Sequence, residues 1–103
     1  MKDRRDAVVI GGGVAGLCAA RELARRGLGV TIVERGRLGA EASHAAAGML
    51  APQSEADRDD EFFRLQCAGR DLYPAFAEAL RAETDIDVEL DRTGTLYLAL
   101  TEE

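Results

Sequence analysis

Residues 8–34 read VVIGGGVAGLCAARELARRGLGVTIVE, and this stretch decides the fold of the chain. An uninterrupted apolar run over 7–10 indicates a strand that is covered on both faces. A glycine-rich turn follows, and then a helix over about 14–26 that Gly27 is suited to end. A second apolar run over 29–33 completes a strand–helix–strand unit. Because the crossover is so short, the two strands must be parallel and the connection right-handed.

The glycines of this turn have the spacing of a dinucleotide-binding fingerprint, GxGxxG. Gly11 makes the tight turn out of the strand, Gly13 lets a pyrophosphate approach the backbone, and Gly16 lets the helix pack closely on the sheet. The N–H groups at the start of the helix point at the phosphates. Glu34 closes the second strand, near the spacing of about 20 residues expected for an acid that binds a ribose 2′-hydroxyl. The pattern predicts a site for FAD or NAD rather than NADP, the alternative being a structural turn in an unrelated α/β domain.

The composition is that of one small soluble globular domain, with 103 residues, 47% of them hydrophobic and 31% charged. A net charge of −6 without a basic run argues against nucleic acid or an anionic membrane surface as a partner. No apolar run reaches the ~18 residues of a membrane span, and glycines interrupt the N-terminal run that superficially resembles a signal peptide. Cys18 and Cys67 are far apart, so reduced thiols are expected rather than a disulfide. These features together predict a cytoplasmic protein.

Small residues dominate from 39 to 48, and three interpretations stay open: a flexible linker, an alanine-rich helix, or backbone lying close against a flat ligand. The pattern from Ser54 to Asp57 is suited to cap the next helix. Apolar residues then recur at helical spacing, which indicates core packing over a helical segment at 53–85. Pro74 lies inside that segment, so a kink or break is expected there.

Apolar and polar residues alternate over the last part of the chain, on either side of a turn sequence that contains Gly94. This pattern predicts an antiparallel β-hairpin over 86–103. The acids at 87, 89 and 91 could suggest a metal or acid/base cluster. The favoured interpretation is that the two-residue period of a strand puts their side chains on one solvated face. No metal site is predicted. The predicted organisation is therefore 1–52, 53–85 and 86–103.

The fingerprint, Glu34 and the segment RLGAEASHAAAGMLAP at 37–52 carry a resemblance to a known family. They resemble the N-terminal part of the D-amino-acid oxidase-like family of FAD-dependent oxidoreductases, and within it the glycine-oxidising branch of thiamine biosynthesis. The fingerprint is shared by many flavoproteins, whereas the segment from Glu41 to Pro52 is more specific. The resemblance implies FAD as cofactor and an α/β fold: the N-terminal βαβ of a Rossmann-like FAD-binding domain over 1–52, then a helix, then the first hairpin of a substrate domain.

Matching positions assign cofactor contacts to four places. These are Val14 and Ala15 under the pyrophosphate, Glu34 and Arg35 at the adenosine ribose, Ala42 and Ser43 near the phosphates, and Ala47, Gly48 and Met49 along the isoalloxazine. Met49 is also expected to border the substrate. No catalytic residue is assigned within the chain. His44 is its single histidine, and a packing or hydrogen-bonding role is expected for it rather than that of a base.

The activity implied by the resemblance is oxidative deamination of glycine to glyoxylate, ammonia and hydrogen peroxide. Its partners are then a small amino acid or amine substrate and molecular oxygen as electron acceptor, with homo-oligomerisation of the complete enzyme left open. The alternatives are a relative that acts on sarcosine or a D-amino acid, an NAD-dependent dehydrogenase, and a noncatalytic nucleotide-binding fragment that needs a partner chain. Because family enzymes are several times longer, the chain is expected to be an N-terminal fragment that is inactive alone.

Overall fold

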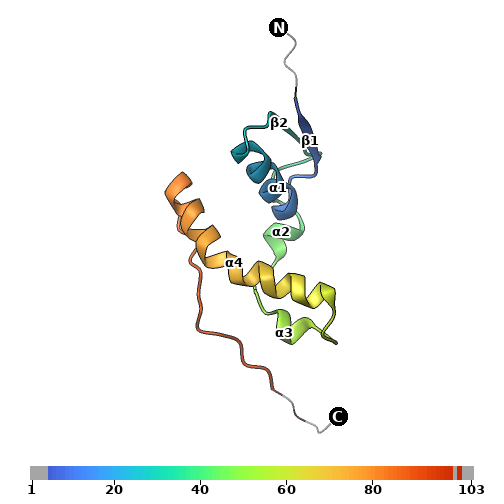
Figure 1. Cartoon of the computed structure of the whole chain (residues 1–103), viewed down its shortest axis with the longest axis vertical. Coiled ribbons are helices and arrows are strands. Elements are labelled where there is room, and N and C mark those ends of the chain that lie inside the picture. Colours follow the sequence, from blue (N-terminus) through green and yellow to red (C-terminus); the bar gives the residue numbers. More distant parts are fainter. Residues whose placement is uncertain (1–4, 99, 101–103) are drawn as a thin grey trace. The chain divides into compact units, whose positions relative to one another are not determined.

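The structure, a computed structural model, describes residues 5–98 and 100, which fall into two compact units that divide between Gly48 and Met49. The helices and strands, labelled in Figure 1, are β1 (Ala7–Ile10), α1 (Val14–Arg25), β2 (Val30–Val33), α2 (Ala42–Ala45), α3 (Pro52–Glu55) and α4 (Glu61–Thr84). The first unit holds the elements from β1 to α2, and the second holds α3 and α4. No helix in the described part of the chain is long and apolar enough to cross a membrane.

The first unit is a parallel βαβ, as the sequence predicts. β1 and β2 are hydrogen-bonded neighbours in parallel, with Ala7 opposite Val30 and Ile10 opposite Val33. The connecting helix α1 packs on both strands and buries Ala20. Gly27 ends the helix with a φ of 83°, a left-handed conformation that glycine adopts without a steric penalty.

The turn between β1 and α1 brings backbone very close to backbone. Gly11 has a φ of 103° and donates its N–H to the Val33 carbonyl at 2.8 Å, which ties the turn to the end of β2. A Cβ built on Gly16 would overlap the Gly11 carbonyl oxygen and lie 3.3 Å from Cγ1 of Val9. The absence of a side chain at Gly16 therefore allows α1 to start directly against β1.

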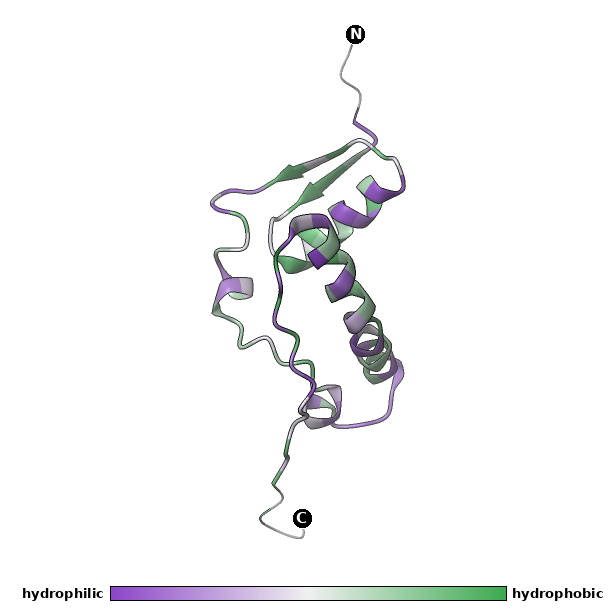
Figure 2. Ribbon diagram, turned by 90° about the vertical axis from the view of Figure 1, so that its left-hand side faces the viewer, coloured by the Kyte–Doolittle hydropathy of each residue, from purple (hydrophilic) through white to green (hydrophobic). Residues whose placement is uncertain are grey.

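One face of the two-stranded sheet is uncovered, contrary to the expectation that β1 is covered on both faces. Ala7 and Val9 are half-buried, whereas Val8 is 60% exposed and Ile10 is 87% exposed. The physical reason is that the described residues form two strands with α1 against one side, so alternate side chains have nothing to pack on. Figure 2 shows both strands as strongly apolar.

In the second unit the long helix α4 begins later than predicted. Its N-cap is Asp60, whose carboxylate accepts a hydrogen bond from the Phe63 N–H at 3.0 Å, so the expected cap at Ser54–Asp57 is wrong. Asp60 satisfies a first-turn donor directly, whereas the earlier serine lies in the short helix α3. α4 packs on α3 and buries Ala77.

α4 runs through Pro74 to Thr84 as one helix, so the chain is not broken at the proline. In Figure 1 its ribbon changes direction near the middle of the helix. Tyr73 and Phe76 make an edge-on ring contact with centroids 5.7 Å apart, close to the proline on the chain. The helix ends where Asp85 turns into the left-handed region at a φ of 58°.

Residues 86–98 and 100, the described part of the predicted hairpin over 86–103, contain no strand. Carboxylates make tight local turns instead: Asp87 accepts from the Glu89 N–H and Asp91 from the Thr93 N–H, each at 2.8 Å. Glu89 also has a φ of 54°, which interrupts an extended chain. Alternation indicates a strand only when one face has an apolar surface to cover it, and here Leu96 is 83% exposed. Residues 99 and 101–103 lie outside the described residues.

Candidate functional site

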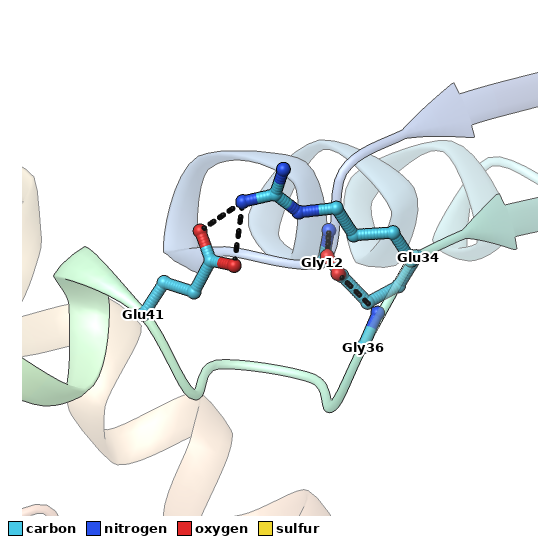
Figure 3. Close-up of polar contacts among 5 residues, drawn as sticks. Gly12, Glu34, Gly36 and Glu41 are labelled. Carbon is cyan, nitrogen blue, oxygen red and sulfur yellow. Dashed lines mark hydrogen bonds and ion pairs between the residues drawn. The ribbon is translucent and has the colours of Figure 1, made fainter.

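The carboxylate of Glu34 lies at the end of β2 against the glycine turn. The Gly12 N–H donates to its Oε2 and the Gly36 N–H donates to its Oε1, both at 2.8 Å (Figure 3). These two bonds, that from Gly12 first, hold the pKa of Glu34 below its usual value. A carboxylate offers about four lone-pair sites, so each oxygen can still accept one more hydrogen bond. Glu34 is therefore a fixed, ionised acceptor.

The start of α1 is bonded to a residue far along the chain. The Val14 N–H donates to Oγ of Ser43, on α2, at 2.9 Å. The first bond inside the helix runs from the Leu17 N–H to the Gly13 carbonyl at 2.9 Å, so the N–H groups before Leu17 have no partner within the helix. The Ser43 hydroxyl accepts from Val14 and still has its own proton to donate to an anion at this helix start.

The connection between β2 and α2 folds back over the glycine turn. The Gly39 N–H donates to the Gly12 carbonyl at 2.8 Å, and Gly39 has a φ of 68°. Nη2 of Arg35 lies 2.8 and 3.0 Å from the two carboxylate oxygens of Glu41, an exposed ion pair that Figure 3 shows across the connection. A Cβ on Gly12 would overlap Cδ2 of Leu38, so the connection lies close against the turn.

These contacts enclose an open pocket of about 480 Å³ within the first unit. Its lining includes several residues that the sequence predicted for a cofactor: Gly11, Gly13, Glu34, Arg35, Ala42 and Ser43. It also includes residues that were not predicted: Ile10, Gly12, Val33, Arg37, Gly39, Ala40 and Glu41. Of these, Gly12 and Gly39 could have been found, because glycine is expected where space is tight or φ is positive: a Cβ on Gly12 would overlap Leu38, and Gly39 has a φ of 68°.

The other predicted residues do not line this pocket. Val14 reaches its edge through the bond to Ser43, Ala15 follows on α1, and Gly16 packs against β1. Ala47 and Gly48 follow α2, which is a single helical turn rather than the long alanine-rich helix that the composition also allowed. Met49 begins the second unit and is exposed, and His44 is exposed on α2. Contacts of Ala47, Gly48 and Met49 with a flavin ring stay predictions.

A parallel βαβ unit with a glycine turn at the helix start and an ionised acid at the end of the second strand defines a dinucleotide-binding protein of the Rossmann type. The family described as "DAO: FAD dependent oxidoreductase" matches residues 6–103. The chain belongs to this family of FAD-dependent oxidoreductases, which confirms the resemblance seen in the sequence.

Known proteins similar to this chain carry related names. It is 46% identical to glycine oxidase from Geobacillus kaustophilus over 103 residues, which are 100% of this chain and 27% of that protein. It is 46% identical over 83 residues to the bifunctional protein ThiO/ThiG from Trichormus variabilis, covering 81% of this chain and 13% of that protein. The crystal structure of the Geobacillus glycine oxidase matches 82% of this chain and 23% of its own with a TM-score of 0.79. The chain thus spans about a quarter of the length of these glycine oxidases.

Proposed function

We propose that this chain is the FAD-binding N-terminal part of a glycine oxidase. The observation that carries the proposal is that one pocket contains both the Glu34 carboxylate, at the end of β2, and the Ser43 hydroxyl, beside the start of α1. The similarity to glycine oxidases over the whole chain supports the same function.

The residues of the pocket fit the adenosine diphosphate half of FAD. Glu34 has acceptor capacity left for a ribose hydroxyl, and its lowered pKa keeps it ionised at neutral pH. A 2′-phosphate would bring further negative charge beside this carboxylate, which disfavours NADP. The start of α1, the Ser43 hydroxyl and the bare backbone of Gly13 are suited to a diphosphate, because they combine donors with close approach.

The isoalloxazine half would lie along the small residues that follow α2. Ala47 and Gly48 would let a flat ring lie close to the backbone, and Met49 would border the substrate. When bound, FAD supplies the hydride acceptor for oxidation of the amino acid α-carbon. The residues of this chain bind and orient the cofactor.

The proposed reaction is oxidative deamination of glycine to glyoxylate and ammonia, with oxygen as acceptor and hydrogen peroxide as the second product. The names of the relatives support this choice over sarcosine or a D-amino acid. A role in thiamine biosynthesis is supported by the relative named ThiO/ThiG. A cytoplasmic location stays a prediction of the sequence.

Cofactor binding is tested with the purified chain. FAD is added, excess is removed by desalting, and the visible absorption of the protein fraction is measured; NAD and NADP are added in parallel samples, and their retention is measured from the ultraviolet absorption of the nucleotide released when the desalted protein is denatured. We expect retained flavin absorption and no retention of the other two nucleotides. Gly13→Val is the control for lost binding, because a branched side chain would fill the diphosphate position and its Cβ would lie 3.3 Å from Oγ of Ser43. A colourless wild-type fraction would contradict FAD binding by this chain.

The substrate is tested with a chimera in which this chain replaces the matched N-terminal residues of the Geobacillus glycine oxidase. We expect the chimera to bind FAD and to release peroxide with glycine faster than with sarcosine or D-alanine. A chimera that binds FAD and reacts with none of them would contradict the proposed activity, while leaving cofactor binding intact. A preference for sarcosine or D-alanine would instead support the alternative substrates.

A further inference from the structure

We propose that Arg35 and Glu41 form a positioning pair that holds Ser43 at the start of α1. The inference deepens the proposed function, since it concerns the same pocket. It adds a positioning role to Arg35, which the sequence placed at the adenosine ribose. A single guanidinium nitrogen of Arg35, Nη2, lies 2.8 and 3.0 Å from the two carboxylate oxygens of Glu41, so the pair joins the two residues while the other guanidinium nitrogens keep their donors.

The helix α2 has little else to hold it in place. It is one turn long, its N-cap Glu41 makes no capping bond with its side chain, and none of its four residues is buried. A buried apolar face, which fixes most helices, is therefore missing here. The connection before this turn is tied to the glycine turn by the bond from the Gly39 N–H to the Gly12 carbonyl, and the turn itself has two polar ties: the pair between Arg35 and Glu41 and the bond from Val14 to Ser43.

The two ties are close together on the chain, so they act on the same short turn. Glu41 is the N-cap of α2 and Ser43 is its second residue. Arg35 directly follows Glu34, which the Gly12 and Gly36 N–H groups fix at the end of β2. The ion pair therefore links the turn that carries Ser43 to the fixed end of β2. Loss of either charge would let the turn move and would weaken the contact between Ser43 and the helix start.

The first test measures FAD affinity of Arg35→Gln, of Glu41→Gln and of the exchanged pair R35E/E41R. Exposed ion pairs contribute modestly, so we expect each single variant to bind FAD about two- to five-fold more weakly. The exchanged pair should recover most of that loss. If Arg35 acted only through contact with FAD and Glu41 had no positioning role, Glu41→Gln would free the Arg35 charge and leave the affinity unchanged or tighter. That result, or no recovery in the exchanged pair, would overturn the proposal.

The second test needs no cofactor and reads the contact itself. The amide proton shift and exchange rate of Val14 are measured by NMR in the wild type and the same variants, with Ser43→Ala defining complete loss of the contact. In both single variants the amide proton shift and exchange rate of Val14 should change toward the values of Ser43→Ala. In R35E/E41R they should return toward the wild-type values. Arg37→Gln is the matched control, because it removes a positive charge from the same connection outside the pair, and it should leave Val14 unchanged.

An unchanged amide proton shift and exchange rate of Val14 in both single variants would overturn the positioning role. The two tests also separate this proposal from the proposed function. If the wild-type chain binds no FAD, the proposed function fails, and the behaviour of Val14 alone then decides whether Arg35 and Glu41 position Ser43.

Discussion

The same substitution at two helical glycines should have opposite effects on stability. Gly16 lies in the first turn of α1, where a Cβ would overlap the Gly11 carbonyl oxygen and lie 3.3 Å from Val9. Gly69 lies inside α4, and a Cβ there would have no neighbour within 4 Å. Alanine at both positions therefore compares a tight backbone contact with open space while the change in chemistry stays identical.

The expected magnitudes follow from two opposing effects. Alanine in place of glycine in a helix is favourable by about 0.5–1 kcal/mol, since it reduces the freedom of the unfolded chain. Gly69→Ala should gain this amount. Overpacking costs about 1–3 kcal/mol, and at Gly16 the contacted atom belongs to the backbone and cannot rotate away. Gly16→Ala should therefore lose about 1–2 kcal/mol after the helical gain is subtracted.

Urea unfolding should be followed by NMR, with separate amide signals from the first unit and from α4. This choice matters because the two units need not unfold together, and one midpoint for the whole chain would mix them. Gly16→Ala should lower the unfolding midpoint of β1 and β2, and Gly69→Ala should raise that of α4. If Gly16→Ala stabilised the first unit as Gly69→Ala stabilises the second, the close approach of α1 to β1 would be refuted.

Three further changes have defined outcomes. Gly11→Ala should destabilise the first unit by about 1–2 kcal/mol in urea unfolding, because its φ of 103° suits glycine; an unchanged midpoint would contradict that turn. Glu34 has a lowered pKa, so the stability it contributes is present above its ordinary pKa of 4.5 and is lost as pH falls through the lower folded value; Glu34→Gln should flatten this acid dependence, and an identical pH profile would argue against it. Asp60→Ala should cost about 1 kcal/mol in thermal unfolding of α4 by removing the bond to Phe63, whereas Asp59→Ala, which removes only an exposed ion pair with Arg64, should cost less.

The βαβ unit could be predicted from the sequence because its signals are local. The apolar runs, the spacing of three glycines and the helix stop at Gly27 each depend on a few neighbouring residues. The observed bounds of β1 are those expected, and α1 ends one residue before the expected position. Patterns that depend on distant packing were less reliable. Alternation over 86–98 predicted strands, yet none forms, since a strand needs a partner and a surface to cover.

The candidate site was predictable in part for the same reason. Glu34 follows from its place at the end of a strand, but its two backbone donors depend on how the connection after β2 folds back. The pairing of Arg35 with Glu41 has no sequence signal, because opposite charges six positions apart across an irregular connection meet only if the backbone brings them together. Ser43 was placed near the phosphates by resemblance, and the structure adds the donor that its hydroxyl accepts from, the Val14 N–H at the start of α1.

The pocket is lined entirely by residues between Ile10 and Ser43, one short continuous stretch of the chain. Loop closure over so few residues costs little entropy, so the pocket can assemble early in folding, before α3 and α4 have formed. A protein built this way could capture its nucleotide while most of the polypeptide is still disordered. The bound nucleotide would then act as a nucleus that stabilises the first unit by mass action, and cofactor supply would influence the yield of folded protein.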